Sequence, residues 1–176
     1  MGQIIFLSLA ALLLFGLCLF FGWMLIGLAR CQVPFVPSSK RIARLMVELA
    51  DIHAGDKVYD LGCGSGTILF EAEKKGGKCI GYEIIPSVIF LARTKKVFKK
   101  SKIEFRCKDF FKQDLSDADV IFCYLWTHIM EKIYQQIWPK LKPGTKLISH
   151  GFSIKNITPE KIIESGRTKI FLYEKK

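Results

Sequence analysis

The most informative stretch of the chain reads Val58-Tyr-Asp-Leu-Gly-Cys-Gly-Ser-Gly-Thr67. Its hydrophobic pattern predicts a short strand over Lys57–Leu61, a glycine loop over Gly62–Gly66 and a helix over Thr67–Lys75 that stops at Gly76–Gly77. Glycines are needed where the backbone turns sharply and a ligand approaches the main chain. The stretch therefore predicts a strand–loop–helix unit with a ligand at its loop.

The spacing of these glycines excludes two kinds of phosphate-binding loop. A dinucleotide fingerprint is G-x-G-x-x-G, but here Gly66 follows Gly64 by two positions rather than three. No Gly-Lys-Ser/Thr follows, which excludes a P-loop. The pattern is instead Asp60-x-Gly62-x-Gly64-x-Gly66, with an acid at the end of the strand. An acid there suits a ligand that carries an ammonium group and no phosphate.

Strands and helices alternate on both sides of this unit. Ser38 or Ser39 can cap a preceding helix that runs to about Ala50, and that helix has one apolar stripe. The stripe consists of Ile42, Leu45, Met46 and Leu49. Further strands are predicted over Lys78–Glu83, Lys102–Arg106, Asp119–Tyr124 and Thr145–His150, helices from Pro86 to about Lys100 and over Thr127–Trp138, and a hairpin from Lys161–Glu164 and Thr168–Glu174 around Gly166–Arg167. This order predicts an α/β fold: a doubly wound, Rossmann-like sheet of seven strands with a C-terminal β-hairpin.

Acids and an aromatic residue follow two neighbouring strands of the predicted sheet. Glu83 lies about 20 residues after the loop, where it can accept hydrogen bonds from a ribose diol. Asp109 and Phe110 follow the third strand and are placed to receive the edge and face of a purine. An ammonium group, a ribose and a purine together describe S-adenosylmethionine. The predicted cofactor residues are Asp60, Gly62, Gly64, Gly66, Glu83, Asp109 and Phe110.

The fourth strand leads into Cys123-Tyr-Leu-Trp-Thr-His128 at the rim beside this ligand. Tyr124 and Trp126 are candidates to line a substrate channel and to contact an amine or sulfonium by cation–π attraction. Packing in the core or against a membrane explains these two rings equally well. His128 is a candidate proton acceptor, although it can also simply start the next helix.

The N-terminus is apolar throughout. Ile4–Ala29 contains no charged residue and would span about 39 Å as a helix, enough to cross a bilayer. A cleaved signal peptide would need a basic segment before a shorter apolar run. Basic residues follow the span, which predicts an outside N-terminus and a cytoplasmic domain. The predicted parts are an anchor at 1–30, a spacer and amphipathic helix at 31–51, and a soluble domain at 52–176.

The formal net charge is +11, and it lies entirely after Ala29. Such a charge suits anionic headgroups or nucleic acid, but no nucleic-acid recognition module is present. Four lysines and an arginine crowd one predicted helix, either as a solvated face or as a contact for anionic headgroups: Arg93, Lys95, Lys96, Lys99 and Lys100.

The six cysteines have no zinc spacing, so no metal site is expected. They indicate buried thiols in a reducing compartment, with a lipidated Cys31 as an open alternative.

Several of these motifs resemble those of class I S-adenosylmethionine-dependent methyltransferases. They are Asp60–Gly66, Glu83, Asp109–Phe110 and the Leu141-Lys-Pro-Gly144 turn. A narrower resemblance adds the apolar span, Pro34-Phe-Val-Pro-Ser-Ser-Lys40, Gly81-Tyr-Glu-Ile84 and Lys108-Asp-Phe-Phe111. It is to the membrane-anchored protein-lysine methyltransferases, relatives of the mitochondrial enzymes that modify an ATP synthase subunit and the adenine nucleotide translocase.

This resemblance implies transfer of a methyl group to a lysine of a membrane protein, at the cell membrane or, in a eukaryote, at the mitochondrial inner membrane. The sequence departs from the wider family in a short tail, with little room for a helix between the fifth strand and the hairpin, and it has no arginine-rich presequence. Cys-Tyr-Leu-Trp replaces the Asn/Asp-Pro-Pro-Tyr/Phe typical of enzymes that methylate adenine or amide nitrogens. A lipid, a quinone, an RNA substrate and a non-enzymatic binding role remain alternatives.

Overall fold

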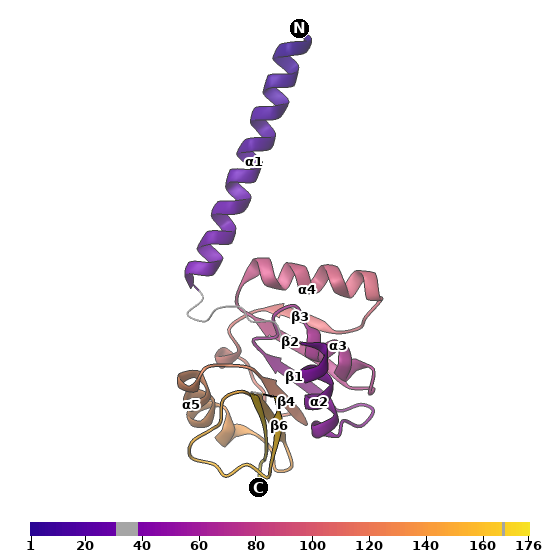
Figure 1. Cartoon of the computed structure of the whole chain (residues 1–176), viewed down its shortest axis with the longest axis vertical. Coiled ribbons are helices and arrows are strands. Elements are labelled where there is room, and N and C mark those ends of the chain that lie inside the picture. The colour runs from indigo at the N-terminus through magenta and orange to yellow at the C-terminus, as the bar shows by residue number, and fades with distance from the viewer. Residues whose placement is uncertain (31–38, 167) are drawn as a thin grey trace.

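The structure is a computed structural model. It describes the backbone of residues 1–30, 39–166 and 168–176, and no side chain of residues 23–30. The predictions for the proline-containing spacer, for Cys31, for Ser38 as a cap and for Arg167 in the hairpin turn lie outside the described residues. A long helix that projects from the domain precedes a layered α/β fold (Figure 1).

The helix α1 spans Gly2–Arg30. Its stretch Gly2–Gly22 has a mean hydropathy of 2.9, and none of it is buried against the rest of the protein. By length and composition, this is the one helix in the described part of the chain that could cross a membrane.

The domain is built on one seven-stranded sheet with the order β3-β2-β1-β4-β5-β7-β6. The first five strands are parallel, and β7 pairs antiparallel with both β5 and β6. The strands are β1 (Lys57–Leu61), β2 (Lys78–Glu83), β3 (Glu104–Cys107), β4 (Val120–Cys123), β5 (Lys146–His150), β6 (Lys161–Ser165) and β7 (Thr168–Glu174). This confirms the predicted doubly wound sheet and its C-terminal hairpin.

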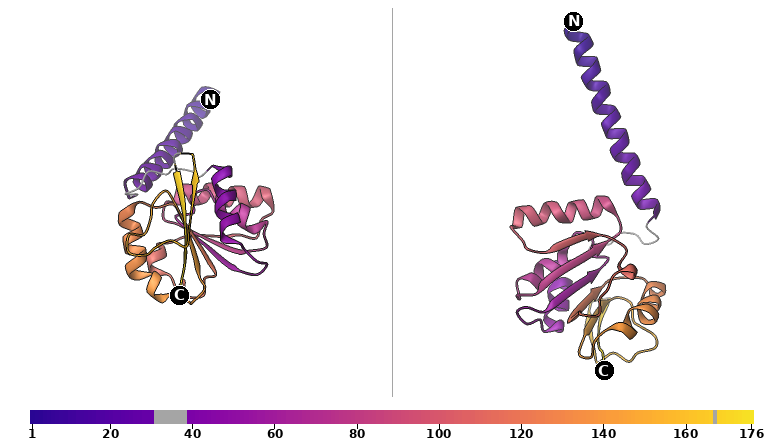
Figure 2. Two further views of the ribbon diagram at one scale, coloured as in Figure 1. Left: turned by 60° about the horizontal axis from the view of Figure 1, so that its bottom comes forward. Right: turned by 180° about the vertical axis from the view of Figure 1, so that it is seen from behind.

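Within the described residues, four helices and two short 3-10 helices cover the sheet. They are α2 (Lys40–Ala50), α3 (Thr67–Glu73), α4 (Pro86–Lys99), α5 (Thr127–Gln136), η1 (Phe110–Lys112) and η2 (Trp138–Lys140). Residues 151–160, between β5 and β6, form no helix, in line with the expected short tail. The helices α2 and α3 lie on one side of the sheet and α5 on the other (Figures 1 and 2).

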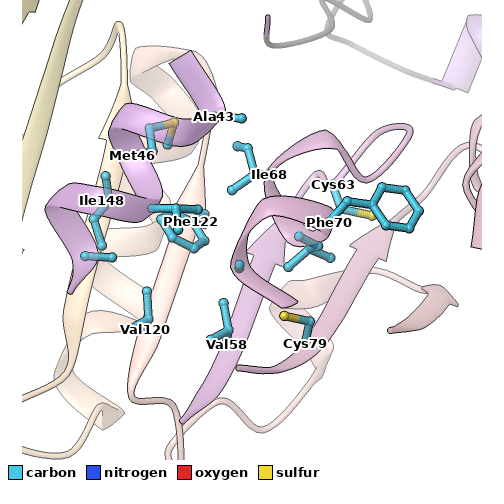
Figure 3. Packing of buried hydrophobic residues seen from close by; sticks show 14 of the residues in the cluster. Ala43, Met46, Val58, Cys63, Ile68, Phe70, Cys79, Val120, Phe122 and Ile148 are labelled. Atoms are coloured by element: carbon cyan, nitrogen blue, oxygen red, sulfur yellow. The ribbon is translucent and has the colours of Figure 1, made fainter. Parts of the chain in front are cut away.

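Each face of the sheet has its own apolar core because successive strand residues point to opposite sides. Val58 and Val120 face α2 and α3, whereas Tyr59 and Ile121 face α5. Figure 3 shows the first of these cores, where Met46 of α2 and Ile68 of α3 meet the sheet. The inner strands β1 and β4 are buried almost throughout, as expected for parallel strands covered on both faces.

The buried face of α2 differs from the predicted stripe. Ile42 and Met46 are buried as expected, but Leu45 and Leu49 are only partly buried. Ala43, Val47 and Ala50 occupy the rest of the contact surface. Small residues there let α2 approach α3 and the sheet closely, and a pattern of large apolar residues does not reveal them. Ser39 caps this helix, since its hydroxyl accepts a hydrogen bond from the Ile42 N–H.

Several predicted boundaries also move by one or two residues. Helix α3 ends at Glu73 rather than Lys75, β4 spans Val120–Cys123 rather than Asp119–Tyr124, and β5 begins at Lys146 rather than Thr145. Strand β3 begins at Glu104 rather than Lys102, because Lys102 N–H is taken by Glu73 at 2.6 Å instead of by the sheet. Helix α5 ends at Gln136 rather than Trp138. The residue before a proline disfavours α-helical geometry, and Pro139 follows Trp138 at once.

The strand order reverses between β1 and β4, which lie side by side while their chain neighbours lead in opposite directions. Ligands of open α/β sheets bind outside the carboxyl ends of the strands at such a switch point. The carboxyl ends of β1, β2 and β4 carry Asp60, Glu83 and Tyr124, so the fold brings the predicted site residues to one edge.

Candidate active site

The glycine loop between β1 and α3 requires a left-handed backbone. Gly62, Gly64 and Gly66 have φ angles of +77°, +53° and +81°. A Cβ on Gly62 would lie 3.1 Å from the Leu125 side chain, and a Cβ on Gly66 would lie 2.5 Å from the Phe105 ring. Packing against Phe105 therefore accounts for the absence of a side chain at Gly66. Phe105 lies in β3, so the need for glycine at position 66 arises from a residue far away in the sequence.

Backbone hydrogen bonds fasten this loop to the end of β2. The N–H groups of Gly62 and Cys63 both donate to the Tyr82 carbonyl at 2.9 Å. Gly66 N–H donates to the Cys63 carbonyl at 2.8 Å, which closes the turn before α3 begins. These hydrogen bonds hold the loop in one conformation against the end of β2.

Glu83 connects the glycine loop to the segment that leads from β2 into α4. Its Oε2 accepts a hydrogen bond from Gly64 N–H at 3.1 Å, and its Oε1 accepts from the N–H groups of Ile84 and Ile85 at 2.8 and 3.0 Å. The residue is only 7% exposed. An ionised carboxylate has about four acceptor positions, so one position remains for a ligand hydroxyl.

Asp60 is a buried residue whose carboxyl group has no hydrogen-bond partner in the described part of the chain. It is 2% exposed, and no donor in the described part of the chain hydrogen-bonds its carboxyl group. Burial, and secondarily the charge of Glu83, raise the pKa of Asp60 to about 8. A buried, unpaired carboxyl is costly. A ligand cation would remove that cost, so the residues present fit a ligand that carries an ammonium group.

Asp109 and Phe110 lie at the end of β3, on the side of β2 away from β1. The Asp109 carboxylate accepts a hydrogen bond from the Phe111 N–H at 3.0 Å and so starts η1. The rings of Phe110 and Phe111 are 4.5 Å apart and half-buried. The structure thus gives Asp109 a local capping role at the start of η1.

A cluster of aromatic rings forms at the ends of β4 and β5. The Tyr124 ring lies 4.1 Å from the His150 ring, and the Trp126 ring lies 5.5 Å from the Phe152 ring. Phe152 is also 6.3 Å from Tyr124, so it joins the two pairs. Trp126 is 44% exposed and forms the outer end of the cluster. Tyr124 and Trp126 therefore belong to one aromatic cluster at this edge of the sheet.

His150 is the member of this cluster that sequence reasoning passed over. It is 7% exposed, and among the described residues neither of its ring nitrogens has a hydrogen-bond partner. Burial lowers the pKa of this imidazole, so it is neutral at pH 7. The available signal was a polar residue at the carboxyl end of the apolar strand Lys146–His150. His128, by contrast, is exposed in the first turn of α5, and no other described side chain contacts it through a hydrogen bond or a ring pair.

In the described part of the chain, no group of three or more histidine, cysteine or acidic side chains is arranged to hold a metal ion. Cys63, Cys79 and Cys123 are buried free thiols, and Cys18 and Cys107 are exposed. Burial raises the pKa of the Cys63 thiol well above its usual value, so this cysteine beside the loop stays protonated.

Comparison with known proteins identifies the family. Residues 60–161, which run from Asp60 to the start of β6, match the model described as the ANTKMT methyltransferase domain. This chain belongs to that methyltransferase family. The matched region contains the glycine loop, Glu83, the Asp109–Phe110 pair and the aromatic cluster.

Curated relatives of this methyltransferase include a protein-lysine N-methyltransferase from Saccharolobus islandicus. The two are 35% identical over 137 residues, which cover 76% of this chain and 85% of the relative. A human lysine N-methyltransferase of an ATP synthase subunit is 23% identical over 150 residues. The match covers 84% of this chain but only 64% of the human protein.

Among solved structures, this methyltransferase resembles an RNA methyltransferase from Salinibacter ruber in complex with S-adenosyl-L-homocysteine. The TM-score is 0.77 and the identity 31%, with 80% of this chain and 94% of that chain covered. TrmN from Thermus thermophilus, at 21% identity and a TM-score of 0.66, shares the fold. The family match, the curated relatives and the structure with bound S-adenosyl-L-homocysteine together establish that this protein is a methyltransferase that uses S-adenosylmethionine as its methyl donor.

Proposed function

We propose that this methyltransferase is a membrane-anchored protein-lysine N-methyltransferase that acts on a membrane protein. The lysine specificity is supported by the similarity to the lysine methyltransferases of Saccharolobus islandicus and human. The membrane location is supported by α1, whose stretch Gly2–Gly22 is long and apolar enough to cross a bilayer and is not buried in the domain. A tether at the start of the chain confines the site to the bilayer surface and so favours substrates embedded in the same bilayer.

The proposed topology follows from the distribution of charge. No basic side chain precedes the apolar run, and Arg30, Lys40, Arg41 and Arg44 follow it. The positive-inside rule then places the N-terminus outside and the catalytic domain in the cytoplasm. We divide the chain into the anchor at 1–30, the spacer with α2 at 31–51 and the methyltransferase domain at 52–176.

The residues at the carboxyl edge of the sheet have distinct proposed roles toward the cofactor. Asp60 binds the ammonium group, because its carboxyl is buried and lacks a partner. Gly62 and Gly64 let the ligand approach the main chain, and Gly66 keeps the loop in place through Phe105. The remaining acceptor position of Glu83 serves a ribose hydroxyl, while Asp109 and Phe110 border the purine. When bound, S-adenosylmethionine supplies an electrophilic methyl group.

The aromatic cluster is proposed to receive the substrate lysine. Tyr124 and Trp126 follow β4, next to β1 and Asp60, and their π-faces attract a cationic amine. A lysine must lose a proton before it can accept a methyl group, and desolvation among rings lowers the pKa of an amine. His150 is neutral and has a free ring nitrogen, so it can hold that proton. His128 is the alternative acceptor and lies outside the cluster.

Replacing His150 by phenylalanine separates these roles. His150→Phe keeps a ring against Tyr124 but removes the proton acceptor, so we expect kcat to fall about 100-fold or more with unchanged cofactor affinity. Thermal stability should be equal or higher, because a buried unpaired polar group is removed. The measurement is steady-state methylation with cofactor titration. His128→Ala is the matched control: if it loses kcat while His150→Phe does not, the proton acceptor is His128.

Label transfer to membranes tests the proposed substrate. The full-length protein, methyl-labelled S-adenosylmethionine and membranes of the source organism are incubated, then separated by organic extraction and a denaturing gel. We expect label in one protein band, and lysine methylation in it by mass spectrometry. Label in the organic phase that resists protease would mean a lipid or quinone substrate instead. An Asp60→Asn protein, still inserted and folded, is the control for enzyme-dependent label.

RNA methylation is the second candidate, favoured by the net charge of +11 and by the similarity to the Salinibacter ruber RNA methyltransferase. Contacts with phosphates would make binding steeply salt-dependent, since each neutralised phosphate releases counterions. Total RNA is therefore added to the same labelling reaction at low and high salt. Nuclease-sensitive label that falls with salt would replace the lysine proposal.

A further inference from the structure

Helix α4 carries large apolar side chains on the side that faces away from the sheet. Phe90, Leu91, Val97 and Phe98 are 66%, 45%, 74% and 84% exposed. Their spacing of one, seven and eight positions puts them on one side of the helix, which we call the α4 outer face. The opposite side holds Ile89 and Ala92, which are buried against the domain. Helix α4 thus has two apolar faces, and in the described part of the chain the outer one is exposed while the other is buried against the domain.

The α4 outer face is too apolar for a surface that meets only water. Two phenylalanines, a leucine and a valine within nine residues form a contiguous patch, and such patches mark contacts with proteins or membranes. Full burial of each of these side chains would gain about 1.5–3 kcal/mol. The remaining question is which partner covers the face.

The position of α4 points to the bilayer. In Figure 1 and in the right-hand view of Figure 2, α4 lies at the end of the domain that faces α1 and runs crosswise to it. The two helices also approach each other. If α1 crosses the membrane, α4 lies at the membrane side of the domain and runs across the direction of α1. This is the arrangement of a spanning helix and an interfacial helix.

The charges around α4 fit the same partner. Lys95, Lys96, Lys99 and Lys100 lie in the second half of the helix or directly after it, and α4 itself contains no acid. Arg93 is tied down, since its guanidinium donates to the Phe105 carbonyl at 3.0 Å. The Lys99 ammonium lies 4.9 Å from the Phe70 ring and still belongs to an exposed residue. Basic residues beside a phenylalanine- and leucine-rich face are typical of helices that bind anionic headgroups.

We propose that α4 is an interfacial helix whose outer face inserts into the headgroup–acyl boundary of an anionic bilayer. The inference rests on the proposed anchoring by α1, and it adds a second contact that sets the orientation of the domain. Helix α4 begins at Pro86, three residues after Glu83, at the edge of the sheet that carries the site. With α4 in the headgroup layer, the site faces lysines that lie close to the membrane surface rather than lysines on long soluble loops.

Insertion is tested with tryptophan fluorescence in the full-length chain. Phe98→Trp is reconstituted at one copy per lipid nanodisc, with one-third phosphatidylglycerol in phosphatidylcholine, and the wild-type emission is subtracted. Acyl chains brominated near the headgroup quench only nearby rings. We expect the added emission to fall about twofold or more, as for a ring at the acyl boundary. Ile162→Trp is the matched control, because Ile162 is an exposed apolar residue of β6, at the other end of the domain.

The possible outcomes distinguish insertion of α4 from anchoring by α1 and from methyl transfer. Co-elution with the discs reports on α1, and quenching reports on α4, so neither depends on methyl transfer. Unquenched Phe98→Trp emission in anionic discs that do hold the protein would overturn the inference. Quenching of Phe98→Trp without quenching of Ile162→Trp would support it.

Discussion

Asp60→Asn should weaken S-adenosylmethionine binding by roughly 10- to 100-fold, the effect of losing one charge-assisted hydrogen bond of about 1.5–3 kcal/mol. The reason is the burial of this carboxyl at 2% exposure and its lack of any partner among the described residues. Asparagine keeps the shape but cannot carry the charge that an ammonium group needs. Isothermal titration with S-adenosylhomocysteine measures the loss in the absence of turnover.

The same residue should make cofactor affinity depend on pH. Because the pKa of Asp60 is raised to about 8 in the unloaded protein, most molecules must release a proton before this carboxylate can bind a cation. Between about pH 6 and pH 7, wild-type affinity should therefore rise by up to tenfold, while the α-amino group of the ligand stays largely protonated. Asp60→Asn should show no such rise. A flat wild-type profile would contradict a role for Asp60 in binding the ammonium group.

Stability should change in the opposite direction to affinity. A folded-state pKa of about 8 lies above the unfolded value, so the protonated Asp60 favours the native state and this contribution is lost as pH rises toward 8. At about pH 8, the free energy of unfolding of unloaded Asp60→Asn should hence exceed that of wild type by roughly 1–3 kcal/mol, and its unfolding temperature should be higher. The difference should be smaller near pH 5. Asp51→Asn, the same change at an exposed carboxylate, is the matched control for both measurements.

Gly66→Ala should be strongly destabilising, by about 2–4 kcal/mol, although it adds a single methyl group. Gly66 has a φ of +81°, where an L-residue pays a backbone cost. The new Cβ would also stand 2.5 Å from the Phe105 ring, and that ring is held in the core against Phe70. The loop or β3 must then move, and cofactor binding should weaken as a consequence. Thermal and urea unfolding of the full-length protein measure the loss.

A matched glycine separates the two causes of this loss. Gly144 has a similar φ of +83°, but a Cβ there would meet nothing within 4 Å. Gly144→Ala should therefore cost only the backbone part, about 1–2 kcal/mol. Shortening the obstructing ring in Gly66→Ala/Phe105→Leu should recover part of the difference when compared with Phe105→Leu alone. Equal losses for Gly66→Ala and Gly144→Ala would show that contact with Phe105 is unimportant.

Local sequence patterns predicted most of the fold because they report directly on short elements. The strands Lys57–Leu61 and Lys78–Glu83 begin and end where they were expected, since glycine or an acid marks each end. Among the boundaries that moved, those at β3 and α5 depend on a side chain or a proline that competes with the regular pattern. The face of α2 was partly wrong because alanines make its closest contacts and carry little hydrophobic signal.

Sequence alone determined the order of the elements, the apolar span and the edge of the sheet at which Asp60, Glu83 and Tyr124 would meet. These follow from periodicity and from the rule that parallel strands end together. Tertiary structure decided what each group lacks or touches: the missing partner of Asp60, the unbonded His150 beside Tyr124, the ring that excludes a side chain at Gly66, and the uncovered outer face of α4. Those properties arise between residues far apart in the chain, so no local pattern contains them.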